Sequence, residues 1–162
     1  MISVTLSQPY PWCLERGLLA VLPIGRSLGD PLVREWRKSY EKRRVAIRSS
    51  ASSIDHAFIK AMKRRMKPDD FEALWMAVLE IPLGAVVGSA LAGCAFVGDS
   101  INNGGALIDI QKGTVCVSLT EFEALPEPVF VAGPDGHLAV AEWGGTGVGM
   151  TAPTTQKQGT LF

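Results

Sequence analysis

The sequence predicts an α+β protein built on a small, closed or nearly closed β-barrel of six or seven mostly antiparallel strands, with helices packed around it. Three observations favour this class. Short apolar or alternating runs are joined by short connections, which is typical of antiparallel pairing. The helical patterns gather between the third and fourth strands instead of alternating with strands. With 162 residues, 47% hydrophobic and 20% charged, the chain can form one globular domain with a sizeable core.

The first elements follow from local patterns. ISVTLS, residues 2–7, alternates as a strand, and WCLERG is typical of a short helix that ends at Gly17. LLAVLPI, residues 18–24, predicts an apolar strand, and RRVAIRS, residues 43–49, predicts the third.

A helix is expected over residues 31–42, between the second and third strands. Asp30 is followed by a proline, which predicts a capping carboxylate and then proline at the first helical position. The spacing puts Leu32, Trp36 and Tyr40 on one face. The two aromatic rings either pack this helix on the barrel or, beside the neighbouring basic side chains, stack on nucleobases.

Two more helices are expected before the fourth strand. Ser52 or Ser53 can cap a helix that runs to about Met66. The sequence Lys-Pro-Asp at 67–69 breaks it and starts another helix to about Glu80, with acidic residues in its first turn, where the helix dipole favours them.

The second half of the chain is expected to complete the barrel. Residues 84–98 are rich in glycine and β-branched residues, which predicts a bent strand at a barrel corner. Residues 113–125 alternate as a half-buried strand that Pro126 and Pro128 end, and VFVA, GPDG and HLAVAEW form a hairpin. After Trp143 the composition shifts to Gly, Thr, Pro and Gln, so we expect a domain over 1–144 and a flexible tail over 145–162.

The charges are unevenly distributed although the net charge is zero. Residues 26–67 hold 13 of the 16 basic side chains and four of the 16 acidic ones, a net charge of +9. Such an excess favours an anionic partner, here RNA or DNA. The candidate nucleic-acid-binding residues are Arg34, Arg37, Lys38, Lys42, Arg43, Arg44, Arg48, Lys60, Lys63 and Arg64.

Nothing in the sequence indicates a metal, a cofactor or a membrane. His56 and His137 do not make a metal site by themselves. The three cysteines form no CxxC pair, which is typical of reduced, buried thiols. The N-terminus lacks the pattern of a signal peptide. The most apolar stretch, residues 81–97, contains a proline and several glycines, which is not typical of a membrane-spanning helix. We therefore expect a cytoplasmic protein.

Four stretches, in this order, are similar to those of a known family: LSQPYPWCLERG, RRVAIRSSAS, IPLGAVVGSALAGCAFV and ALPEPVFVAGPDGHLAVAEW. Over most of residues 1–143 the chain resembles the ASCH domain, a branch of the PUA-like barrel superfamily. The resemblance implies a PUA-like barrel with RNA or nucleotide-like ligands in a central cleft.

The chain departs from the family in the residues that line that cleft. The family's second strand usually carries Gly-x-Lys-x-x-Glu-x-Arg. Gly17 fits, but Leu19 stands at the Lys position, Leu22 at the Glu position and Ile24 at the Arg position. A leucine can neither form a covalent amine adduct nor transfer a proton, so the hydrolase or nuclease chemistry of some family members is not expected here and no catalytic residue is assigned.

The C-terminal QGTLF, residues 158–162, fits Gln-x-x-Leu-Phe. It resembles the motif by which many bacterial replication and repair proteins bind the DNA polymerase sliding clamp, which implies a bacterial or phage setting. Leu161 and Phe162 would fill apolar pockets while the amide of Gln158 hydrogen-bonds at the groove entrance. The alternative is that these residues fold back on the barrel.

The sequence therefore predicts a non-enzymatic nucleic-acid-binding module that the C-terminal tail recruits to the sliding clamp. Two alternatives remain open. One is an ASCH-type hydrolase or ribonuclease that acts on nucleosides or RNA through a divergent site. The other is a protein-binding regulator or inhibitor from a mobile genetic element, whose basic face contacts a protein.

Overall fold

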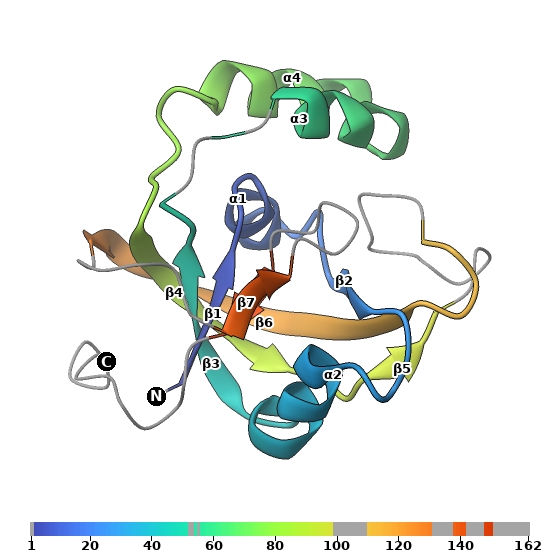
Figure 1. Cartoon of the computed structure of the whole chain (residues 1–162). Coiled ribbons are helices and arrows are strands. Elements are labelled where there is room, and N and C mark those ends of the chain that lie inside the picture. Colours follow the sequence, from blue (N-terminus) through green and yellow to red (C-terminus); the bar gives the residue numbers. More distant parts are fainter. Residues whose placement is uncertain are drawn as a thin grey trace.

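One mixed β-sheet curls into a half-barrel, with helices at both of its ends (Figure 1). The computed structural model describes residues 2–51, 54, 56–98, 110–130, 138–141 and 148–150. The strands are β1 (Ser3–Leu6), β2 (Val21–Gly25), β3 (Arg44–Ser49), β4 (Ala85–Ala92), β5 (Phe96–Val97), β6 (Val115–Phe130), β7 (Leu138–Ala141) and β8 (Val148–Met150).

The strand order confirms that antiparallel pairing dominates. The sheet runs β2-β6-β4-β3-β1-β8-β7, and β5 also pairs with β6. Within the described chain only β1 and β3 are parallel, with Val4 opposite Ile47. The curled sheet and the helices confirm a barrel-like α+β fold.

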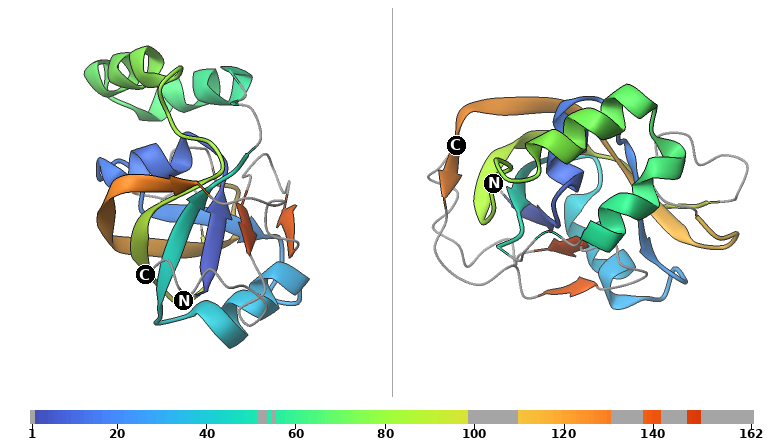
Figure 2. Two further views of the ribbon diagram at one scale, coloured as in Figure 1. Left: turned by 90° about the vertical axis from the view of Figure 1, so that its left-hand side faces the viewer. Right: turned by 90° about the horizontal axis from the view of Figure 1, so that it is seen from above.

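The helices form two groups that the sheet separates (Figures 1 and 2). The elements are α1 (Tyr10–Glu15), α2 (Pro31–Glu35), the π-helical turn η1 (Trp36–Tyr40), α3 (His56–Met62), the 3-10 turn η2 (Lys63–Arg65) and α4 (Pro68–Ala77). α2 and η1 lie at one end of the half-barrel, while α3 and α4 form a layer beyond α1 at the other. The predicted start of α4 is confirmed, with Asp69 and Asp70 in its first turn.

β6 is one continuous strand, so the prediction that Pro126 and Pro128 end it is wrong. The pairing with β4 shifts between Val86, which is opposite Val129, and Gly88, which is opposite Ala124. The prolines fall in this irregular stretch, and a bulge is one of the places in a sheet that tolerate a residue without an N–H group.

β4 passes very close to β6 at Gly88. A Cβ atom at this position would overlap the carbonyl oxygen of Glu123 and the ring of Phe122. Only glycine allows this approach of the two backbones, which coincides with the irregular register and the bend of the sheet.

Asp30 stands at the N-terminus of α2, but its carboxylate does not cap the helix as expected. It accepts hydrogen bonds from the preceding loop instead, from the backbone N–H of Arg26 at 2.6 Å and from the hydroxyl of Ser27 at 3.1 Å. The carboxylate therefore closes the turn that leads into the helix, and these bonds lower its pKa.

The predicted helix over 31–42 consists of α2 and the π-helical turn η1. The rings of Trp36 and Tyr40 stack with their centroids 5.5 Å apart, and both side chains are 0% exposed. They belong to the main core, together with Val4, Ile47 and Leu119. Of the two interpretations of these aromatics, packing on the barrel is therefore the observed one.

The sheet extends into the segment that the composition assigned to the tail. Val148–Met150 form β8, and Val4 of β1 pairs with Met150. The GPDG turn, residues 145–147 and residues 151–162 lie outside the described residues, and so do Gln158, Leu161 and Phe162. None of the helices described here combines the length and the apolar content that a membrane crossing requires.

Candidate nucleic-acid interface

The half-barrel divides the basic segment 26–67 into two separate surfaces (Figures 1 and 2). The first, the α2–η1 surface, consists of exposed side chains at one end of the sheet: Arg34, Arg37, Lys38, Lys42 and Arg43. The second lies in the helical layer at the opposite end and carries Lys60, Lys63 and Arg64, which are also exposed. A single continuous patch over the whole segment is not formed.

The α2–η1 surface is cationic because basic side chains outnumber acidic ones in this part of the chain. Residues 26–44 contain seven basic and three acidic side chains. The carboxylate of Asp30 is held by the loop before α2. The carboxylate of Glu35 accepts a hydrogen bond from the Ser39 hydroxyl at 3.1 Å, and that of Glu41 accepts one from the backbone N–H of Ala95 at 2.9 Å. Its five exposed cations form no ion pair with the residues that the structure describes.

The end of η1 fixes where these cations point. Lys42 has a positive φ of 62°, and its backbone N–H donates a 2.8 Å hydrogen bond to the carbonyl oxygen of Ala92 at the end of β4. This residue turns the chain from η1 into β3, so that Lys42 and Arg43 are exposed beside the helix that carries Arg37.

Arg44 is held within the sheet rather than presented with the other cations. Its guanidinium donates to the Ser89 hydroxyl at 3.2 Å and to the carbonyl oxygen of Glu121 at 3.0 Å. It also forms ion pairs with the carboxylates of Glu121 at 3.4 Å and Glu123 at 3.8 Å. These contacts give Arg44 a structural role between β3, β4 and β6.

Arg48 is separated from both cationic surfaces by burial. Its side chain is 1% exposed, at the position where β3 pairs with Thr5 of β1. Arg48 therefore contributes to neither surface as the structure stands.

The helical layer forms a groove between α3–η2 and α4. The lining residues of this α3–α4 groove are Lys60, Lys63, Phe71 and Trp75, and its volume is about 390 Å³, within the range of small-ligand sites. Phe71 and Trp75, at i and i+4 on α4, stack with a centroid separation of 6.1 Å and an interplanar angle of 24°. Almost all of the exposed lining is carbon.

Cations lie along the α3 side of this groove. The ammonium group of Lys63 lies 5.6 Å from the centre of the Phe71 ring, a cation–π distance. His56 meets the indole of Trp75 edge-on, with the two rings 6.1 Å apart. Trp75 nevertheless stays 45% exposed, an uncommon state for so large an apolar side chain.

Phe71 and Trp75 lie in a helix that the sequence predicts, but they are not among the predicted site residues. The signal that could have identified them is the i, i+4 aromatic pair directly after a helix with five basic and no acidic side chains over residues 56–67.

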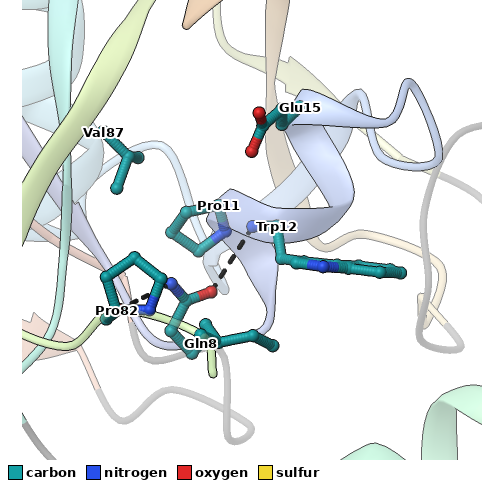
Figure 3. A pocket seen from close by; sticks show the side chains of 7 residues that line it. Gln8, Pro11, Trp12, Glu15, Pro82 and Val87 are labelled. Atoms are coloured by element: carbon teal, nitrogen blue, oxygen red, sulfur yellow. Dashed lines mark hydrogen bonds between the residues drawn. The ribbon is translucent and has the colours of Figure 1, made fainter. Parts of the chain in front are cut away.

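The region where the family resemblance places a cleft is filled. Leu19, Leu22 and Ile24 are at most 3% exposed and belong to the main core. A small pocket remains between α1 and the loop before β4, with Gln8 and Trp12 in its wall (Figure 3). The amide of Gln8 donates to the carbonyl oxygen of Pro82 at 2.9 Å. At about 30 Å³ the pocket has room for about one water molecule, not for a nucleotide.

Two of the cysteines are poor nucleophiles because they are buried. Burial raises the pKa of Cys13 to about 12 and that of Cys116 to about 11. Among the residues described, no group of three or more histidine, cysteine or acidic side chains could hold a metal ion.

Comparison with known proteins identifies no relative of this chain by family model or by similarity to curated proteins.

Proposed function

We propose that this protein is a non-enzymatic nucleic-acid-binding module, and that the α2–η1 surface provides its main contact with phosphates. The observation that carries this proposal is the group of five exposed cations that form no ion pair with any residue in the described part of the chain. Lysine and arginine on such a surface replace the counterions of a phosphate backbone, which supplies affinity without sequence specificity.

The rigid attachment of this surface supports the proposal. The turn η1 begins at Trp36 and ends at Tyr40, and both side chains are 0% exposed in the main core. Because these two side chains anchor the backbone of η1, that backbone does not have to be ordered when the surface binds a polyanion, which favours affinity.

Salt dependence tests the proposal. Full-length protein is titrated into a fluorescein-labelled duplex and the corresponding single strand at about 50 and 200 mM salt. If all five cations contact phosphates, the log–log slope of affinity against salt is about −3.5 to −4.5. Arg37→Glu/Lys38→Glu should reduce the affinity and the magnitude of this slope. Lys112→Glu is the matched control, because Lys112 is exposed in the turn before β6, outside both cationic surfaces.

The same titration separates the alternatives. Absence of binding at about 50 mM salt, where phosphate contacts are strongest, would exclude the nucleic-acid module and favour a basic face that contacts a protein. Turnover of RNA or nucleosides would favour a hydrolase with a divergent site.

The family assignment is also a proposal. The curled mixed sheet, the parallel pairing of β1 with β3 and the four similar stretches support an ASCH-type, PUA-like barrel. The buried Leu19 and Leu22 would then have converted the family's cleft into core, which agrees with a binding function that has moved to the surface.

Recruitment to a sliding clamp is the second part of the proposal and rests on the sequence QGTLF. Two buried apolar anchors contribute about 1.5–3 kcal/mol each before ordering costs, which suits a micromolar complex. A bacterial clamp should retain the intact protein in a pull-down and release Leu161→Ala/Phe162→Ala. Equal retention of both proteins would exclude QGTLF as the segment that binds the clamp.

A further inference from the structure

We propose that the α3–α4 groove is a second, separate site that binds single-stranded nucleic acid by stacking bases on Trp75 and Phe71. This inference rests on the proposed function and names a substrate class for it. The helices that form the groove lie at the opposite end of the half-barrel from α2 and η1 (Figures 1 and 2).

The aromatic wall of the groove supplies the stacking surface. The rings of Phe71 and Trp75 lie one turn apart on α4 and stack with an interplanar angle of 24°. Trp75 is 45% exposed, and the rings of Phe71 and His56 each lie 6.1 Å from its ring, centre to centre. An exposed indole that already has such neighbours loses less side-chain freedom when a base stacks on it.

The opposite wall supplies the charges that a phosphate backbone needs. Lys60 and Lys63 line the groove, and Arg64 is exposed on η2 at the end of the same wall. The acidic residues of the layer, Asp69, Asp70 and Glu72, all lie on α4. A bound strand would therefore place its bases toward α4 and its phosphates toward α3–η2.

This arrangement selects unpaired strands. Bases inside a duplex are stacked on one another and cannot reach a ring on the protein surface, whereas every unpaired base offers a π-face. An acidic peptide could pair with the lysines, but it would leave the exposed indole unused. The combination of aromatic rings and cations therefore favours single-stranded DNA or RNA.

A matched set of Trp75 variants tests the stacking. Full-length protein is titrated into a labelled oligothymidylate of about 12 nucleotides and into a duplex. Trp75→Ala should weaken single-strand binding about ten-fold and leave duplex binding unchanged, while Trp75→Phe stays within about two-fold of the unmodified chain. Leu79→Ala, which removes a 95% exposed apolar side chain just after α4, is the control and should have no effect.

Lysine variants separate charge from stacking. Lys60→Gln/Lys63→Gln should reduce the magnitude of the single-strand salt slope by about 1.4, whereas Trp75→Ala lowers affinity without changing that slope. Circular dichroism of each variant confirms that the helical layer is retained.

The outcomes distinguish this inference from the proposed function. If the oligothymidylate binds Trp75→Ala and the unmodified chain equally well, the groove is not a stacking site, and the α2–η1 surface can still bind nucleic acid. If neither oligonucleotide binds the unmodified chain at about 50 mM salt, both proposals are overturned. If an oligoglutamate peptide binds in a way that depends on Trp75, and the single strand does not bind, the proposal that the groove binds nucleic acid is overturned.

Discussion

The indole Nε1 of Trp36 donates a 2.8 Å hydrogen bond to the carbonyl oxygen of Gly93. This bond joins the π-helical turn η1 to the corner that follows β4. The backbone at Gly93 passes so close to β6 that a Cβ there would overlap the side chain of Ser118. The cationic α2–η1 surface is therefore attached to the sheet through a partly buried hydrogen bond as well as through apolar packing.

Substitution of Trp36 should show how much this attachment contributes. Trp36→Phe keeps an aromatic ring against Tyr40 but leaves the Gly93 carbonyl without its donor, so the free energy of unfolding should fall by about 1–3 kcal/mol. Trp36→Ala also leaves a cavity and should cost about 3–5 kcal/mol. Urea unfolding followed by circular dichroism measures both. Trp75→Phe, on the exposed groove, should change stability by less than about 0.5 kcal/mol. Unchanged stability of Trp36→Phe would contradict the role given to the bond.

Lys42 offers a pair of substitutions that separate binding from backbone strain. Its φ of 62° lies in the left-handed region, which disfavours every side chain but suits glycine. Lys42→Gly and Lys42→Ala remove the same charge and should weaken oligonucleotide binding equally. Lys42→Gly should nevertheless be more stable than Lys42→Ala by about 1 kcal/mol. Equal stability of the two variants in urea unfolding would show that the turn is not strained.

Arg44 should behave as a structural residue although it belongs to the basic segment. Arg44→Ala removes hydrogen bonds to Ser89 and to the Glu121 carbonyl and should lower the free energy of unfolding by about 1–2 kcal/mol. Its effect on oligonucleotide affinity should stay within about two-fold. Arg37→Ala should show the reverse pattern, with weaker binding and stability within about 0.5 kcal/mol. A loss of affinity for Arg44→Ala as large as for Arg37→Ala would place Arg44 in the interface.

Patterns that depend on neighbouring residues predicted the fold well. The β3 segment, the start of α4 at Pro68 and the dominance of antiparallel pairs follow from local periodicity and from short connections. The errors arise where groups outside the element itself decide the outcome. The bulge opposite β4 lets β6 continue through Pro126 and Pro128, and the Arg26 and Ser27 amides draw the Asp30 carboxylate away from α2.

From the sequence, the candidate site could be predicted only as a segment that is rich in basic residues. The sequence showed an excess of cations between residues 26 and 67, but not that the sheet would place them at opposite ends. Burial of Arg48 and the ion pairs of Arg44 depend on strand pairings that join distant parts of the chain. The groove between Lys63 and Trp75 likewise depends on how α3 and α4 pack.

Alkaline pH should destabilise the protein through its buried thiols. The pKa of Cys13 is raised by burial from 9.0 to about 12, so above pH 9 the native state binds more protons than the unfolded state. The free energy of unfolding should therefore be insensitive to this thiol below pH 9 and should fall by up to about 1.4 kcal/mol per pH unit above it. Burial of Cys116 and Tyr10 raises their pKa values as well and adds to the decline.

Urea unfolding between pH 8 and about pH 10.5 measures this dependence. Cys13→Ala should be less stable at pH 8 because it leaves a cavity, yet its stability should decline less steeply above pH 9. Cys94→Ala removes an exposed thiol and serves as the control. If the free energy of unfolding fell equally steeply above pH 9 in Cys13→Ala and in the unmodified protein, the alkaline destabilisation could not be assigned to Cys13.

The helical layer has a core of its own. Ile59, Leu74 and Ile81 form an apolar cluster apart from the main core, and Trp12 and Met66 contact both. So small a cluster gives the layer less stability than the sheet, so α3 and α4 should open as a unit while the barrel stays folded. Amide hydrogens of the layer should then exchange with deuterium sooner than those of β4 and β6. A ligand in the groove would slow that exchange only in the layer, so the exchange pattern would report which end of the molecule is occupied.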